Sequence, residues 1–82
     1  MDRFHAIQVF VKVAECRGFA AAARDLAISP PAVTRAVALL EDRLGTRLLV
    51  RTTRSVRLTE SGERFLQDAR RILLELEEAE EA

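Results

Sequence analysis

The chain has 82 residues, 49% of them hydrophobic, with one cysteine, one histidine and a formal net charge of zero. A chain of this length buries one modest core, so we expect one domain and at most one protruding element. Cys16 has no second cysteine to pair with, and no cysteine and histidine cluster could hold a metal, which favours a reducing compartment, the cytoplasm. The charges among the first 15 residues exclude a signal peptide, and no apolar run is long enough to cross a bilayer. We therefore expect no membrane association, no metal and no cofactor.

The zero net charge conceals an uneven distribution of charges along the chain. Residues 1–71 contain all 13 basic residues and eight acidic ones, a net charge of +5, whereas residues 72–82 contain five glutamates and no base. The charged residues between 43 and 57 are all arginines, the side chain suited to bidentate phosphate contacts: Arg43, Arg47, Arg51, Arg54 and Arg57. This acid-free segment favours a polyanionic partner, although a solvated face of a protein can have the same composition.

Two helices are predicted in the first third of the chain. Apolar residues recur at three- and four-residue steps between residues 3 and 16, which predicts an amphipathic helix. Gly18 is expected to end this helix in the left-handed conformation, with Phe19 packing back onto the core. The alanine-rich segment 20–27 predicts a short second helix, whose small side chains allow another helix to cross closely.

The stretch SPPAVTRAVALLEDRL, residues 29–44, predicts a third helix. Ser29 is a good N-cap and Pro30 fits a first helical turn, although the restriction on a residue before proline also allows a start at Pro31. Gly45 is expected to end the helix. Its predicted buried face steps by four, three and four residues through Val33, Val37, Leu40 and Leu44.

The remainder of the chain predicts a hairpin and a long final helix. Strand-like runs at 47–50 and 56–58 flank the polar segment 51–55, which indicates a two-stranded wing. Thr59 can cap a helix from residue 60 to the end, where Glu60 and Glu63 favour the positive end of the helix dipole, while Gly62 should weaken the first turn. The fold class is therefore mainly α: a winged helix-turn-helix over residues 1–58, with a three-helix core and a two-stranded β wing, followed by a linker helix for dimerisation over residues 59–82.

The open face of the third helix carries the strongest functional signal. At about 100° per residue, one set of side chains lies opposite the buried face of this helix. In the first half of the helix these side chains are apolar, hydroxylated or cationic, and near its end the set includes the acidic Asp42. Small apolar groups suit thymine methyls and Arg35 suits a guanine edge, whereas Asp42 would be repelled by phosphates. We therefore expect only the first turns to enter the major groove of double-stranded DNA. The predicted base contacts are Pro30, Pro31, Thr34, Arg35 and Ala38.

The two prolines at the start of this helix allow two interpretations. Neither carries an amide hydrogen, so the helix start loses two donors and Ser29 can cap only the Ala32 amide. The paired rings then offer a stiff apolar surface to a thymine methyl or a sugar. Alternatively, Pro30 and Pro31 only fix the turn between two helices.

The segment FAAAARDLAISPPAVTRAVALLEDRLGTRLLVRTTRSVRLTESGERFL resembles the N-terminal winged helix-turn-helix of LysR-type transcriptional regulators, and the resemblance covers nearly the whole chain. It implies that residues 29–35 face the operator, that the LE at 40–41 and the LG at 44–45 lead into the wing, and that the RTTR at 51–54 touches backbone phosphates. The expected phosphate contacts are Ser29, Arg51, Thr52, Thr53 and Arg54. Pro30 and Ala36 stand where family members often have glutamine, which leaves Arg35 as the main polar reader of bases. Alternatively, Arg35 is only solvated and residues 51–54 form an ordinary hairpin tip.

The final helix repeats apolar residues at steps of four and three, a seam that one helix cannot bury alone. This seam comprises Phe65, Ala69, Ile72, Leu76 and Ala79, with Leu66 and Leu73 widening it toward the winged core or a partner. We expect a homodimer through this helix, and the resemblance implies antiparallel pairing; alternatively, Phe65 and Ile72 cover the domain's own core. The chain ends within a helix-forming stretch, so it is expected to be part of a longer regulator with an effector-binding domain for a small molecule, in which tetramers can form.

Together these features predict a sequence-specific DNA-binding domain of a LysR-like transcriptional regulator. A rival interpretation keeps the winged fold as a scaffold for protein interaction through the seam of the final helix alone. An enzyme is not expected, because no nucleophile lies beside a base, no pair of acids suggests a catalytic cleft and no phosphate loop is present. His5 and Cys16 are expected to be a surface imidazole and a packed thiol without catalytic roles.

Overall fold

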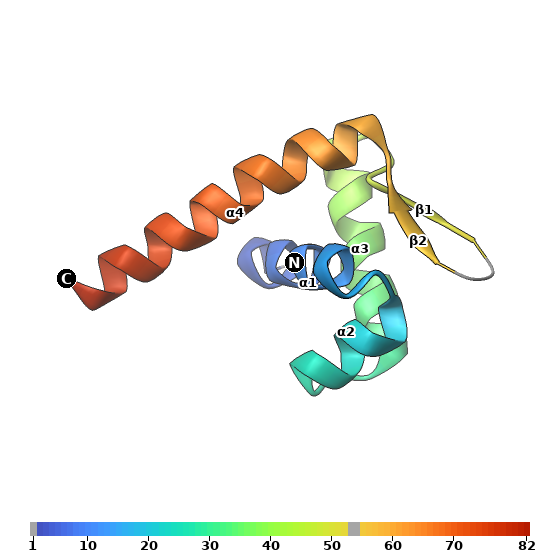
Figure 1. The fold of residues 1–82 in the computed structure, drawn as a ribbon, viewed down its shortest axis with the longest axis horizontal. Helices are drawn as coiled ribbons and strands as arrows, with labels where there is room; N and C mark the ends of the chain where they lie inside the picture. The colour runs from blue at the N-terminus through green and yellow to red at the C-terminus, as the bar shows by residue number, and fades with distance from the viewer. Residues whose placement is uncertain (1, 53–54) are drawn as a thin grey trace.

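The computed structural model describes residues 2–52 and 55–82. Its elements in chain order are α1 (Arg3–Cys16), α2 (Phe19–Leu26), α3 (Pro30–Leu44), β1 (Leu49–Arg51), β2 (Val56–Leu58) and α4 (Glu60–Glu81). The strands pair antiparallel, with Leu49 opposite Leu58 and Arg51 opposite Val56. The winged helix-turn-helix expected from the sequence is confirmed (Figure 1).

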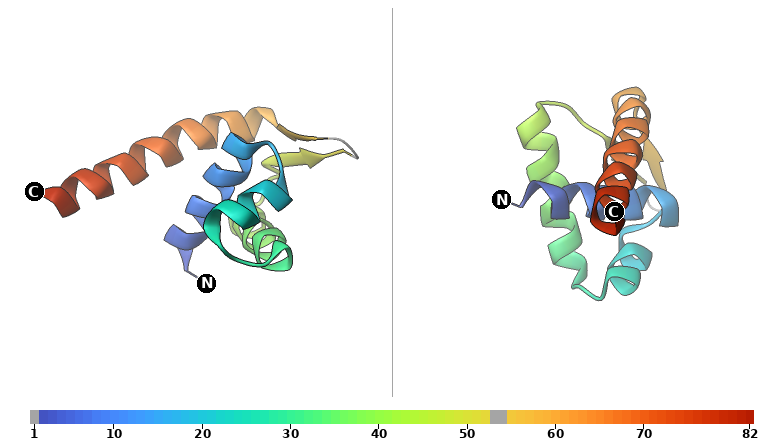
Figure 2. Two further views of the ribbon diagram at one scale, coloured as in Figure 1. Left: turned by 60° about the horizontal axis from the view of Figure 1, so that its bottom comes forward. Right: turned by 90° about the vertical axis from the view of Figure 1, so that its left-hand side faces the viewer.

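The three short helices surround one core, and the two remaining parts project from it. α1 packs against α2 and α3, and it also contacts α4 and β2. α4 extends from this core in one direction and the strands of the wing extend in another, along a molecule 43 Å long (Figures 1 and 2). No helix in the described part of the chain combines the length and the apolar character needed to cross a membrane.

The core is centred on α1, where Val9, Phe10 and Val13 are completely buried. The Phe10 ring packs against the Phe65 ring of α4 with 5.6 Å between centroids, so the first half of α4 contacts α1. The buried face predicted for the third helix is correct at Val33, Val37 and Leu40 but wrong at Leu44, which is 41% exposed because it lies in the last turn, at the edge of the packed region. Ala36 is buried in α3 instead.

The turn between α1 and α2 differs from the expectation at one residue. The left-handed residue is Arg17, with φ 56°, whereas Gly18 is extended and serves as the N-cap of α2. Ala27 ends α2 in the same left-handed conformation, with φ 57°. A left-handed non-glycine residue costs about 1 kcal/mol, so tertiary packing determines both turns more than local preference does. Phe19 is buried, as expected.

The first turn of α4 packs directly on the chain segment that enters β1. Thr59 caps α4 as predicted, because its hydroxyl oxygen accepts from the Gly62 amide at 2.9 Å. A Cβ atom at Gly62 would collide with the backbone carbonyl oxygen of Leu48. Gly62 therefore does more than weaken the helix start: its missing side chain allows this close approach.

Candidate nucleic-acid interface

The start of α3 has few free backbone donors. The Ser29 hydroxyl oxygen accepts from the Ala32 amide at 3.2 Å, and the Ser29 carbonyl accepts from the amides of Ala32 and Val33 at 3.0 and 3.2 Å. Pro30 is the first helical residue, so the alternative start at Pro31 is wrong, and neither proline has an amide hydrogen. This helix start presents apolar rings instead of amide donors, which suits a base edge or a sugar better than a phosphate.

The outer face of α3 is the one that the helical periodicity predicts. All five residues expected to contact bases are exposed in the structure: Pro30, Pro31, Thr34, Arg35 and Ala38. Asp42 is exposed on the later part of the same helix. Arg35 has no ion-pair partner within 4.0 Å among residues 2–52 and 55–82, so its charge is available to a ligand.

The start of α2 forms a cationic hollow with the wing. Gly18 provides no side-chain cap, so the first amides of α2 remain able to donate to a bound acceptor. Three arginines line this arginine hollow, which we define by Arg17, Arg24 and Arg51 together with Gly18 and Ser55. Oxygen atoms of a phosphate group match both kinds of donor, the backbone amides and the guanidinium groups.

The Arg51 side chain has a well-defined position within this hollow. Its guanidinium carbon lies 4.0 Å from the centroid of the Phe19 ring, at the first residue of α2. This cation–π contact joins the wing to the helix-turn-helix and orients the guanidinium beside the α2 start. The sequence predicts Arg51 as a phosphate contact, whereas no pattern in it indicates Arg17 or Arg24.

A second, smaller hollow joins the outer face of α3 to the wing. Thr34 and Ala38 line it from α3, and Arg47 and Arg51 line it from the segment that forms β1. Because Arg51 borders both hollows, the exposed face of α3 and the arginine hollow belong to one continuous surface.

The arginine-rich segment is not free of acids in space. Arg47 Nε lies 3.8 Å from Glu41 Oε2, an acid of α3 that precedes the segment in the sequence. Arg43, Arg51 and Arg57 have no acidic partner within 4.0 Å in the part of the chain that the structure describes. The positive patch is therefore smaller than the sequence predicts, because Glu41 partly neutralises the charge of Arg47.

The base of the wing turn is shaped by Thr52 and Ser55. The Thr52 amide and hydroxyl both donate to the Ser55 carbonyl, at 2.9 and 2.8 Å, and the Thr52 hydroxyl oxygen accepts from the Ser55 amide at 3.0 Å. Thr52 is exposed beside Arg51. The two other expected phosphate contacts, Thr53 and Arg54, lie outside the described residues.

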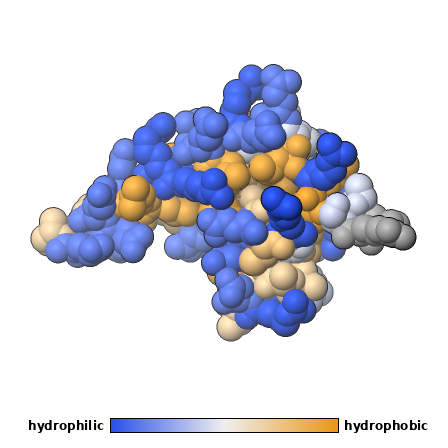
Figure 3. All heavy atoms as spheres, in the orientation of Figure 1, coloured by the Kyte–Doolittle hydropathy of each residue, from blue (hydrophilic) through white to orange (hydrophobic). Residues whose placement is uncertain are grey.

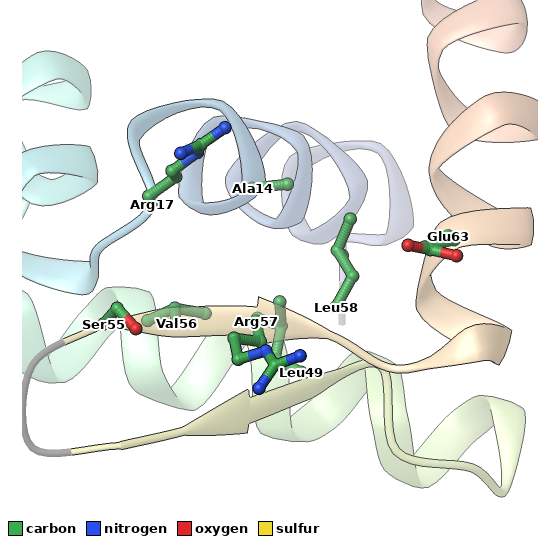
Figure 4. A pocket seen from close by; sticks show the side chains of 8 residues that line it. All are labelled: Ala14, Arg17, Leu49, Ser55, Val56, Arg57, Leu58 and Glu63. Atoms are coloured by element: carbon green, nitrogen blue, oxygen red, sulfur yellow. The ribbon is translucent and has the colours of Figure 1, made fainter.

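The side chains of β2 alternate between the domain and solvent. Leu58 points from β2 toward α1, while Arg57 points the other way (Figure 4). Val56 and Leu58 are half-buried and Arg57 is exposed. Arg57 is therefore the solvent-facing residue of β2.

The predicted dimerisation seam of α4 is divided by the fold. Ala69 is completely buried in the protomer's own core, so the expectation that it contacts a partner is wrong. Phe65 is half-buried against Phe10 and is mainly a core residue. Ile72 and Leu76 are 38% and 37% exposed, and Ala79 is exposed. Hydrophobic surface shows among the hydrophilic side chains of the projecting part of α4 (Figure 3). The distal half of the seam is therefore the part that a partner could cover.

Comparison with known proteins identifies the family. The profile described as "Bacterial regulatory helix-turn-helix protein, lysR family" matches residues 4–63, which span all three short helices, the wing and the start of α4. The chain belongs to the LysR family. This LysR-family chain is 46% identical over 95% of its length to the HTH-type transcriptional regulator YhjC of Escherichia coli K12, and 43% identical over 99% to the HTH-type transcriptional activator AaeR of the same organism. It spans about a quarter of the length of these relatives, 26% in both cases.

Solved structures agree with this assignment. The chain resembles the protein in the crystal structure of the CbnR_DBD–DNA complex with a TM-score of 0.93 and 42% sequence identity, over 99% of this chain and 92% of that one. The similarity includes the long C-terminal helix as well as the winged helix-turn-helix, because nearly the whole of both chains is aligned.

Proposed function

We propose that this LysR-family chain is the sequence-specific, double-stranded DNA-binding domain of a transcriptional regulator. The observation that carries the proposal is a continuous surface: the exposed face of α3, which includes Thr34 and Arg35, adjoins the arginine hollow. A base-reading helix flanked by phosphate-binding groups is the arrangement that a helix-turn-helix uses on duplex DNA. The similarity to the CbnR_DBD, a protein solved together with DNA, supports the proposal.

In this proposal the first turns of α3 read bases in the major groove. Arg35, which has no ion-pair partner in the described part of the chain, donates to guanine O6 and N7, while Pro31 and Ala38 lie against thymine methyls. Thr34 offers one hydroxyl to a base edge. Pro30 contacts a methyl or a sugar in addition to starting the helix. Asp42 keeps the later turns of α3 away from the phosphates.

Phosphate binding falls to the residues around this helix. Arg51 and the first amides of α2 hold one backbone segment, with Arg17 and Arg24 adding charge. The Ser29 hydroxyl accepts from the Ala32 amide and still has its own hydrogen to donate to a phosphate oxygen. Thr52, Thr53 and Arg54 extend the contacts along the wing.

Two chains are expected to act together through α4. The exposed Ile72, Leu76 and Ala79 pack against the same helix of a second copy in antiparallel orientation, and the partly buried Phe65 borders the contact. Antiparallel pairing centred on this seam also brings Glu80 and Glu81 of one helix close to Arg70 and Arg71 of the other. Two copies then read two half-sites separated by about one helical turn of DNA or a multiple of it.

The complete regulator is proposed to be longer than this chain, because the chain spans only about a quarter of its relatives. The remaining part would contain a small-molecule effector domain and support dimers or tetramers. We place the regulator in the cytoplasm, where its operator DNA lies, and assign it no catalytic activity.

Selection of duplexes from a random pool tests the proposed function. The 82-residue chain should enrich a defined sequence that contains a guanine within each half-site, and gel-shift titration should show tighter binding to it than to scrambled duplex. Absence of any enrichment, together with self-association through α4, would favour the rival interpretation of a protein-interaction module.

A further inference from the structure

We infer that Glu41 is a positioning residue whose carboxylate fixes the direction of α4 relative to α3, and thereby the half-site spacing that a dimer accepts. The inference rests on the proposed function for its DNA consequence. Its structural basis is independent of DNA and lies in the short segment Arg47–Leu48, which enters the wing between the two helices.

From the α3 side, Glu41 holds this segment by its amide groups. Glu41 Oε2 accepts from the Leu48 amide at 2.7 Å and from the Leu49 amide at 3.2 Å, and Arg47 Nε lies 3.8 Å from the same oxygen. The Glu41 side chain is only 16% exposed. An acceptor that is largely shielded from water makes stronger hydrogen bonds than an exposed one, so the two backbone hydrogen bonds attach the segment firmly to α3.

From the α4 side, the same segment is held by its carbonyl groups. The Thr59 hydroxyl donates to the Arg47 carbonyl at 2.7 Å, and the Thr59 amide donates to the Leu48 carbonyl at 3.0 Å. Gly62 allows the first turn of α4 to rest on that Leu48 carbonyl. The Leu48 side chain is buried in the core. The segment therefore has both edges occupied, one by α3 and the other by α4, and the two helices cannot tilt independently while Glu41 stays in place.

The length of α4 amplifies any tilt at this junction. Its 22 residues extend about 33 Å at a rise of about 1.5 Å per residue. A tilt of about 6° at the first turn moves the distal end by about 3.4 Å, which equals the rise of about one base pair along one strand. Because the exposed part of the seam lies in this distal half, a small change at Glu41 alters the distance between the two reading helices of a dimer.

The spacing preference of the dimer provides the first test. Two copies of the selected half-site are placed in duplexes whose separation varies in steps of one base pair, and affinities are measured for wild type, Glu41→Ala and Glu41→Gln. We expect Glu41→Ala to reduce the preference for the optimal spacing at least fivefold, whereas Glu41→Gln keeps it because the amide oxygen still accepts from both backbone amides. An equal loss of affinity at every spacing would show that Glu41 only stabilises the fold in general, and it would overturn the inference.

A measurement without DNA separates this inference from the proposed function. Spin labels at Asp42→Cys and Gln67→Cys, both exposed, in a Cys16→Ser background report the distance between α3 and α4. Glu41→Ala should broaden a single narrow distance distribution, and an unchanged distribution would refute the inference even if DNA binding is lost. Thr59→Ala and Thr59→Ser form a second pair of variants, on the α4 side of the junction. Thr59→Ala should broaden the distance distribution as Glu41→Ala does, whereas Thr59→Ser should not, since serine retains the hydroxyl that donates to the Arg47 carbonyl. If wild type binds no duplex, the proposed function fails, and the distance distributions still decide whether Glu41 fixes the two helices.

Discussion

The guanidinium of Arg51 stacks on the ring of Phe19, with 4.0 Å between Cζ and the ring centroid. The contact joins β1 to the first residue of α2, and the rest of α2, all of α3 and two turns lie between them in the sequence. It gives the arginine hollow a defined geometry before any ligand binds, which lowers the entropy cost of binding.

A double-mutant cycle measures this contact. Phe19→Leu and Arg51→Ala should show a coupling of about 0.5–1 kcal/mol in the free energy of unfolding, obtained from urea titrations of both single variants and the double variant. Arg57→Ala combined with Phe19→Leu is the matched control, because Arg57 is exposed on the neighbouring strand and points away from the domain. Equal couplings for the two arginines would show that the stacking contributes nothing specific.

Gly62 should tolerate no side chain. Gly62→Ala places a methyl group on the Leu48 carbonyl oxygen, and relief requires movement of backbone, so we expect a loss of about 1–3 kcal/mol of unfolding free energy. Gly18→Ala is the control, because that position is extended and has open space around its Cβ. Chemical denaturation measures the free energy of unfolding of both variants. If helix propensity alone mattered at position 62, alanine would stabilise α4; a loss of stability there shows that the close approach of the Leu48 carbonyl dominates.

Arg35 should determine sequence preference more than overall affinity. Arg35→Ala is expected to cost about 1–3 kcal/mol on the selected duplex and much less on scrambled duplex, because the lost contact is with a base. Arg43→Ala removes the same charge from the last turn of α3, beyond the proposed contact, and should have a small effect on both duplexes. Titrations that show equal losses on both duplexes for Arg35→Ala would remove this residue from base reading.

The salt dependence of binding should reveal the number of phosphates held. With about four phosphates per protomer and two protomers, the slope of log K against log salt should be near −7. Arg51→Ala and Arg54→Ala are each expected to make that slope about one unit less steep and to weaken all duplexes alike. A slope near zero in fluorescence-anisotropy titrations would be incompatible with the proposed grip on the DNA backbone.

Self-association should depend on the distal seam of α4. Ile72→Glu buries a charge in the proposed helix pair and should raise the dimer dissociation constant more than tenfold, which corresponds to about 1.4 kcal/mol. Leu74→Glu is the matched control, because Leu74 is even more exposed, at 55%, but lies on the opposite side of the helix. Sedimentation equilibrium measures both variants, and an equal response would show that the seam is not the contact surface.

The elements of this chain are encoded locally and were therefore predictable. Helix periodicity, the Ser29 and Thr59 caps and the helix end at Gly45 appear in the structure as expected. The turn after α1 differs from the expectation: Arg17, beside the buried Phe19 and Gly18, takes the left-handed conformation that local preference gives to glycine.

The contacts between elements were less predictable, for a related reason. Arg17, Arg24 and Arg51 meet only through the fold, and no spacing in the sequence indicates it. Likewise, the seam of α4 has one continuous period in the sequence, yet its first half serves the protomer's core through Phe65 and Ala69. Periodicity specifies which face is apolar, whereas the tertiary structure decides which partner covers it.

The paired prolines that open α3 have a practical consequence for solution studies. Neither Pro30 nor Pro31 gives a signal in an amide-detected NMR spectrum, although both lie at the proposed centre of the DNA contact. Their ring carbons and hydrogens, labelled selectively with carbon-13, supply two isolated reporters in a chain that has only these prolines. Nuclear Overhauser effects from the rings would then register a neighbouring thymine methyl or deoxyribose directly.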